Sequence, residues 1–115
     1  MSDQQLLDLA AKAAMRAGLK LECPDELDGV YVSRCSGRNG YTWNPLEDGG
    51  DALRLVVVLR FQVVTYADWV EVLQDGIRMA NATSEYFAGC MFATARAAIV
   101  RAAAETHRRE VEEKH

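Results

Sequence analysis

The stretch "GYTWNPLEDGGDALRLVV", residues 40–57, decides the fold, because strand-like patterning gives way there to helical patterning. Pro45 has no backbone N–H to donate, so it cannot continue a central strand. It does suit the first turn of a helix. The stretch therefore predicts a strand that ends near Trp43 and a helix that begins shortly after it.

Two residues could cap this helix. Asn44 is followed three residues later by Glu47, and Asp48 is followed in the same way by a carboxylate. Negative charge is favourable at a helix N-terminus in either case. The glycines also suggest a phosphate cradle, but each carboxylate would repel an anion by about 1–4 kcal/mol at close range. A bound divalent cation is the remaining alternative, and we favour helix capping over it. The residues assigned to the helix start are Trp43, Asn44, Pro45, Asp48 and Asp51.

The residues before this stretch predict a helix and a hairpin. Ser2 and Gln5 fit a capping box, and Gly18 ends the helix in a left-handed conformation. Residues 30–44 read as two strands around an Asn-Gly turn. Residues 19–22, "LKLE", could form a further short strand.

The residues after this stretch continue the helix and then return to strands. We expect helix to about Arg60 and strand over residues 61–66. A long buried strand is the rival for residues 53–60, because they are rich in β-branched side chains. The pair Asp75-Gly76 suits a type I′ turn between two further strands.

A long helix is predicted to close the chain, capped by Thr83 or Ser84. From Glu105 the sequence is nearly all charged, which predicts a solvated helical tail that frays. The expected order is α-β-β-α-β-β-β-α in a single α+β domain over residues 1–115. In this fold a small, mainly antiparallel sheet, made of two hairpins plus a strand, is packed by three helices.

The bulk composition favours an ordinary soluble globule. Of 115 residues, 50% are apolar and 26% are charged, and the formal net charge of −4 argues against a general nucleic-acid binder. No apolar run is long enough for a membrane span, and no secretory signal opens the chain. The odd number of cysteines, 3, suits free thiols in a reducing cytoplasm. We find no catalytic motif and no spacing typical of a metal or cofactor site, so none is predicted.

Arg34 and Arg38 are a first candidate for interaction. They flank the first hairpin turn, near Tyr31, Tyr41 and Trp43. Basic and aromatic side chains on a small sheet can bind single-stranded nucleic acid. We favour the alternative in which the aromatics belong to the core and the arginines are solvated.

The final helix supplies a second candidate. Phe87, Met91 and Ala95 share one stripe of it, whereas Phe92 and Ile99 point elsewhere. Leaving the second pair in water would expose an apolar patch, which soluble monomers rarely do. We therefore predict a homodimer with this helix in the interface.

Two blocks, "WNPLEDGGDALRL" (residues 43–55) and "ATARAAIVRAAAE" (residues 93–105), resemble a family of small phage and prophage proteins. Members carry a Trp-Asn-Pro-Leu…Asp-Gly-Asp-Ala-Leu-Arg-Leu block in mid-chain and end in an alanine-rich helix. They share no agreed activity, so the resemblance implies no catalytic residues. It implies an accessory protein of the bacterial cytoplasm with the element order given above.

These patterns lead to one expectation about function. The chain should be a small non-catalytic phage or prophage accessory protein that binds a host or defence macromolecule. Its acidic residues between positions 22 and 51 would suit a basic patch on such a partner. The alternative is a nucleic-acid-associated module of phage replication or recombination.

Overall fold

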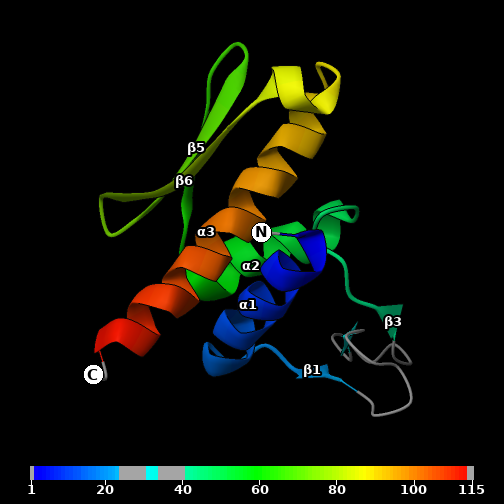
Figure 1. The fold of residues 1–115 in the computed structure, drawn as a ribbon, viewed down its shortest axis with the longest axis vertical. Helices are drawn as coiled ribbons and strands as arrows, with labels where there is room; N and C mark the ends of the chain where they lie inside the picture. Colours follow the sequence, from blue (N-terminus) through cyan, green and yellow to red (C-terminus); the bar gives the residue numbers. More distant parts are fainter. Residues whose placement is uncertain (1, 24–30, 34–40, 114–115) are drawn as a thin grey trace.

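The computed structural model describes residues 2–23, 31–33 and 41–113, and within them the fold is α+β, as predicted (Figure 1). The order of helices and strands agrees with the expected one, with one further short strand near the N-terminus. The elements are α1 (Asp3–Arg16), β1 (Leu21–Glu22), β2 (Val32–Ser33), β3 (Tyr41–Thr42), α2 (Gly49–Leu59), β4 (Gln62–Thr65), β5 (Trp69–Gln74), β6 (Ile77–Thr83), the 3-10 turn η2 (Ser84–Phe87) and α3 (Met91–Glu113).

Helix α1 begins and ends as the sequence predicts. The Ser2 hydroxyl accepts the Gln5 N–H at 3.2 Å, and the Gln5 side chain accepts the Ser2 N–H at 2.8 Å, which completes the capping box. At the other end Gly18 has a φ of 109°, and the Leu19 N–H donates to the Ala14 carbonyl at 2.9 Å. This Schellman ending directs the chain toward β1.

A first antiparallel sheet joins β1, β2 and β3 in that order. Val32 pairs with Thr42, as expected for a hairpin over residues 30–44. The turn of that hairpin lies outside the described residues. The "LKLE" segment does supply a strand, because Leu21 pairs with Ser33.

Helix α2 ends at Leu59, so the rival strand over residues 53–60 is wrong. Arg60 takes a left-handed conformation with φ 56°, and the Phe61 N–H donates to the Val56 carbonyl at 3.0 Å. This is again a Schellman ending, here with a non-glycine residue in the left-handed position. The Gln74 amide supports the same end by donating to the Leu59 carbonyl at 2.8 Å.

The larger sheet is antiparallel and has the order β4-β5-β6. Asp75 and Gly76 have φ values of 53° and 79°, which is the type I′ geometry expected for their pair. Helix α3 packs against β5 and β6 (Figure 1). Val70, Val72 and Ala82 are buried in these strands and belong to the core.

The start of the final helix differs from the prediction. The segment that was expected to open it forms the separate turn η2, which ends because Ala88 and Gly89 take left-handed φ values of 52° and 78°. Cys90 then precedes α3, and its sulfur accepts a backbone N–H from the first turn at 3.5 Å. Neither Thr83 nor Ser84 therefore caps the long helix.

Helices α1 and α3 pack side by side through small residues (Figure 1). The charged end of α3 takes part in this packing, because Arg16 Nη1 lies 2.9 Å from Glu110 Oε2 and Thr106 is buried. Residues 105–113 thus continue a regular helix beside α1 and are not fully solvated as we expected, whereas the fraying of this tail stays a prediction. Among the described residues, no helix combines the length and apolar character that crossing a membrane requires. The buried alanines of the two helices are Ala10, Ala11, Ala13, Ala14, Ala97, Ala98, Ala102, Ala103 and Ala104.

Candidate protein-binding surface

An apolar hollow of about 350 Å³ lies between α2 and α3. Leu53 lines it and also lines an adjoining hollow of about 380 Å³, which extends the apolar surface along α2 to Val57. We call the two hollows together the α2–α3 groove. Its apolar walls are formed by Leu53, Val56 and Val57 of α2 and by Phe92, Ala95 and Ile99 of α3.

Three large apolar side chains of this groove face solvent. Leu53 is 61% exposed, Val57 is 66% exposed and Phe92 is 78% exposed. A single exposed apolar side chain is ordinary, whereas several gathered along two adjoining hollows are typical of a binding surface. The described part of the chain therefore leaves one side of α2 and the first turn of α3 uncovered.

Phe92 and Ile99, the two residues of the final helix expected to face a partner, differ in exposure. Phe92 is exposed, but Ile99 is only 7% exposed and lies at the floor of the groove. Its burial follows from the packing of α2 against α3, which the sequence pattern of one helix alone does not reveal. The prediction that Phe87, Met91 and Ala95 share one stripe of the final helix is also wrong, because Phe87 belongs to η2 and not to α3.

Leu53 and Val57 are the groove residues that the sequence interpretation missed. They lie four residues apart on α2, outside its buried face, which includes Ala52, Leu55 and Leu59. A helix that is apolar beyond one stripe needs a second covering surface. That excess of apolar residues was the available signal.

Two arginines line the groove. The Arg54 Nη1 atom is 3.4 Å from Asp51 Oδ1, and its side chain is 33% exposed. Arg96 donates from Nε to the Leu46 carbonyl at 2.9 Å, which fixes the side chain across the start of α2. Among the described residues that line the groove, none is a carboxylate.

The helix-start residues lie beside the groove and serve the fold. Of the two possible caps, α2 uses Asp48, whose Oδ1 accepts the Asp51 N–H at 3.0 Å. Asp51 is fully buried, and its Oδ2 accepts the Asn44 N–H at 2.9 Å. Asn44 caps a separate turn instead, since its side chain accepts the Leu46 N–H at 3.1 Å. Pro45 lies in that turn, before the helix and not in its first turn as expected.

Trp43 joins this helix start to the first sheet. It is 2% exposed, and its ring meets Tyr31 edge to face with the centroids 6.1 Å apart. The backbone N–H of Trp43 donates to the Tyr31 carbonyl at 2.7 Å. In the described part of the chain, no group of three or more His, Cys, Asp or Glu side chains gathers in a way that would hold a metal ion.

The arginines predicted to contact nucleic acid, Arg34 and Arg38, lie outside the described residues. A different aromatic and basic group is visible on the larger sheet. Tyr66 stacks on Trp69 with the ring centroids 4.0 Å apart, and the Arg78 guanidinium lies 6.0 Å from the Trp69 centroid. The Arg78 charge is compensated by Glu71 at 2.7 Å, which weakens its attraction for phosphate.

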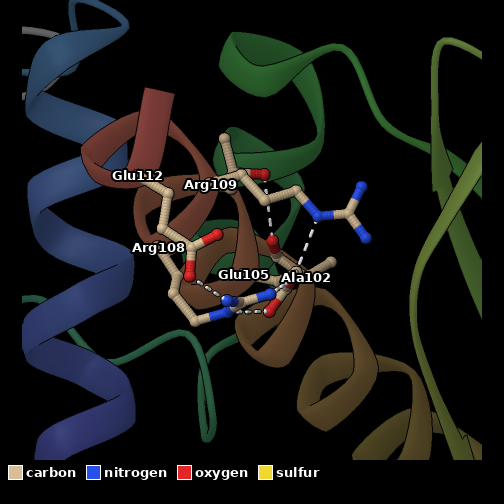
Figure 2. Close-up of polar contacts among 6 residues, drawn as sticks. Ala102, Glu105, Arg108, Arg109 and Glu112 are labelled. Carbon is tan, nitrogen blue, oxygen red and sulfur yellow. Dashed lines mark hydrogen bonds and ion pairs between the residues drawn. The ribbon is translucent and has the colours of Figure 1, made fainter. Parts of the chain in front are cut away.

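A network of ion pairs covers the C-terminal half of α3 (Figure 2). Glu105 accepts hydrogen bonds from Arg108, with Nε at 2.8 Å, and from Arg109, with Nε at 2.9 Å. Glu112 also pairs with Arg108. The hydrogen bond from Arg108 is the main reason that the pKa of Glu105 falls to about 2. These pairs join residues of one helix, so they stabilise α3.

His107 faces the junction of α1 and α3. Burial lowers the pKa of its imidazole, and the positive charges of Arg16 and Lys12 lower it further, against an opposing effect of Glu110. Its Nδ1 atom is buried and has no hydrogen-bond partner within the described residues. The neutral form of His107 therefore suits this packing.

The described residues form a small α+β fold in which they leave an apolar groove uncovered. Comparison with protein-family models, with curated proteins and with solved structures found no match for this chain. The resemblance of residues 43–55 and 93–105 to phage and prophage proteins accordingly stays a hypothesis.

Proposed function

We propose that this chain is a small non-catalytic accessory protein of a phage or prophage that acts by binding a host or defence protein in the bacterial cytoplasm. The observation that carries the binding role is the exposure of Leu53, Val57 and Phe92 around the α2–α3 groove. The phage setting is supported by the two resembling sequence blocks alone.

The groove has the features of a contact centre. Burying an exposed side chain the size of valine, leucine or phenylalanine stabilises a complex by about 1.5–3 kcal/mol. Several such side chains in one place can offset the loss of translational and rotational freedom on association. Interfaces concentrate their binding energy in a few buried side chains of this kind.

A comparison of two variants tests the binding role. The wild-type chain, Phe92→Asp and Tyr86→Asp are each used to capture proteins from host lysate, and a captured protein is purified and titrated against all three. Tyr86 is the matched control, because it is 77% exposed in η2 and does not line the groove. We expect Phe92→Asp to weaken binding at least tenfold and Tyr86→Asp to leave it unchanged. Equal binding by both variants would contradict a role for the groove.

The alternative function is a nucleic-acid-associated module of phage replication or recombination. The observation that favours it is the exposed Tyr66 ring stacked on Trp69 beside Arg78. With a net charge of −4, we expect no binding to random DNA or RNA tighter than about micromolar at physiological salt. Submicromolar binding in a mobility-shift assay that Arg34→Ala and Arg38→Ala each weaken would favour the alternative.

A further inference from the structure

Two glycines open helix α2, and the fold accounts for only one of them. A Cβ added to Gly50 would meet Asp48 Oδ1 at 3.1 Å and Arg54 Nη1 at 3.2 Å, so the capping geometry leaves little room for a side chain there. A Cβ added to Gly49 would meet no described atom within 4 Å, and Gly49 is not among the glycines with positive φ. Alanine would therefore fit at position 49 and would favour the helix.

Gly49 lines the groove, where the missing side chain widens the space beside Phe92. Ala52 on the same helix and Ala95 on the facing helix are also small. Glycine is used where another backbone must approach closely. Because Gly49 has no side chain, the groove between the exposed Leu53 and Phe92 has room for the backbone of a partner segment.

The charges of the groove indicate what kind of segment fits. Its charged lining residues, among those described, are Arg54 and Arg96, although the whole chain has a net charge of −4. In a symmetric homodimer through this surface, each copy would present the same arginines to the other, and like charges across an interface oppose binding. Arg54 is already paired with the buried Asp51 at 3.4 Å, whereas Arg96 donates to the neutral Leu46 carbonyl. The Arg96 charge therefore complements a partner that carries a carboxylate.

We propose that the α2–α3 groove binds an amphipathic helix whose apolar stripe is flanked by carboxylates, an inference that rests on the protein-binding role proposed above. Helix α2 has 11 residues and is about 16 Å long, so a partner helix of about three turns would span it. Its apolar residues, at helical spacing, pack against Leu53, Val57 and Phe92. A carboxylate beside the stripe pairs with Arg96, and the backbone of the partner helix passes closest at Gly49.

The probe is a displayed library of stapled 15-residue helices. Each has a fixed stripe of Leu, Ile or Phe at helical spacing and carries Glu, Lys or Gln at the flanking positions. The full chain is used as bait, and Phe92→Asp serves as the counter-selection. We expect enrichment of glutamate beside the stripe. The enriched peptide should bind Arg96→Gln at least fivefold more weakly, whereas its Gln-for-Glu counterpart should bind both forms of the protein equally.

Gly49→Ala separates a role in binding from a role in folding. We expect it to raise the melting temperature by about 1–3 °C, because alanine favours the helix. We expect the same substitution to lower the affinity for the enriched peptide at least fivefold. Val111→Ala is the matched control, because it also places alanine on a helix at a partly exposed site outside the groove. It should leave the affinity unchanged.

The outcomes distinguish the two proposals. The selected peptides that need Phe92 for binding could carry lysine or neutral residues beside the apolar stripe. That result would overturn the proposal of an acidic partner helix and would leave the binding role of the groove standing. Unchanged affinity in Gly49→Ala would overturn the close approach of the partner backbone. If no peptide depends on Phe92, the acidic helix is overturned, and the capture experiment with Phe92→Asp and Tyr86→Asp then decides the binding role by itself. A concentration-dependent dimer that Phe92→Ser abolishes would show that a second copy is the occupant, which also overturns the proposal.

Discussion

Replacement of Asp51 tests the interpretation of the helix start most directly. Asp51 is fully buried, and its carboxylate accepts the Asn44 N–H at 2.9 Å and lies 3.4 Å from Arg54 Nη1. Asp48 is exposed and supplies only the N-cap, with its Oδ1 at 3.0 Å from the Asp51 N–H. The two carboxylates stand three residues apart, but they should differ clearly in their contribution to stability.

The expected magnitudes follow from these contacts. Asp51→Ala removes a hydrogen bond to a charged acceptor and leaves the partly buried Asn44 N–H without its partner, which costs about 2–4 kcal/mol. Loss of the partly exposed ion pair with Arg54 adds little. Asp48→Ala removes an N-cap and costs about 1 kcal/mol. For a chain of this size, 1 kcal/mol shifts the melting temperature by about 4 °C.

Urea unfolding followed by circular dichroism measures these differences. The control is Glu47→Gln, since Glu47 is exposed beside the same helix start and should change stability by less than about 0.5 kcal/mol. The m-value should stay constant across the series if only stability changes. If Asp51→Ala costs no more than Asp48→Ala, the buried carboxylate does not hold the turn before α2 and the reasoning fails. Saturable stabilisation of the wild type by calcium, magnesium or phosphate would instead show that the helix start is a ligand site.

Four other predictions concern the rest of the fold. Arg60→Gly should raise stability by about 0.5–1 kcal/mol in thermal unfolding, because glycine relieves the left-handed conformation of φ 56°; a loss would contradict this. The pKa of Glu105 is lowered to about 2 from 4.5 by its hydrogen bond to Arg108, so its contribution is present above pH 4.5 and disappears as the pH falls toward 2. Glu105→Gln should therefore cost about 1 kcal/mol at pH 7 and nothing at pH 2. His107 has a lowered pKa because it is buried, so the unfolded chain takes up the proton first and stability should fall as the pH drops below 6.5, a slope that His107→Gln should reduce. Light scattering over a range of concentrations tests the homodimer that the sequence predicts; a monomeric mass throughout would contradict it, and an unchanged dimer in Phe92→Ser would exclude the groove as its interface.

The parts of the fold that the sequence predicted depend on interactions between near neighbours. The capping box of Ser2 and Gln5, the left-handed Gly18 and the type I′ turn at Asp75 are each decided within a few residues of the chain. The residue types alone are sufficient to predict such features, because the interacting groups lie a fixed number of residues apart in the sequence. The strand that ends near Trp43 and the helix over residues 49–59 follow in the same way.

The parts that the sequence did not predict depend on contacts between distant residues or on a rare backbone state. Ala88 adopts a left-handed φ that its side chain disfavours, so no local pattern marked the break between η2 and α3. Ile99 is covered by elements that are far from it in sequence, and its burial needs the crossing of α2 over α3. The groove itself was missed for this reason, since it exists only where these two helices meet.

The helix start and the groove are linked through the way α2 is held. At its first turn, Asp48 caps the helix, and Asp51 ties it to the preceding turn through the Asn44 N–H. At its last turn, the Gln74 amide donates to the Leu59 carbonyl. A helix fixed at both ends keeps its exposed side chains in place before any partner arrives, which lowers the entropy lost on binding. The carboxylates of the opening stretch therefore need not touch a ligand to matter for function, because they hold in position the helix that presents the apolar surface.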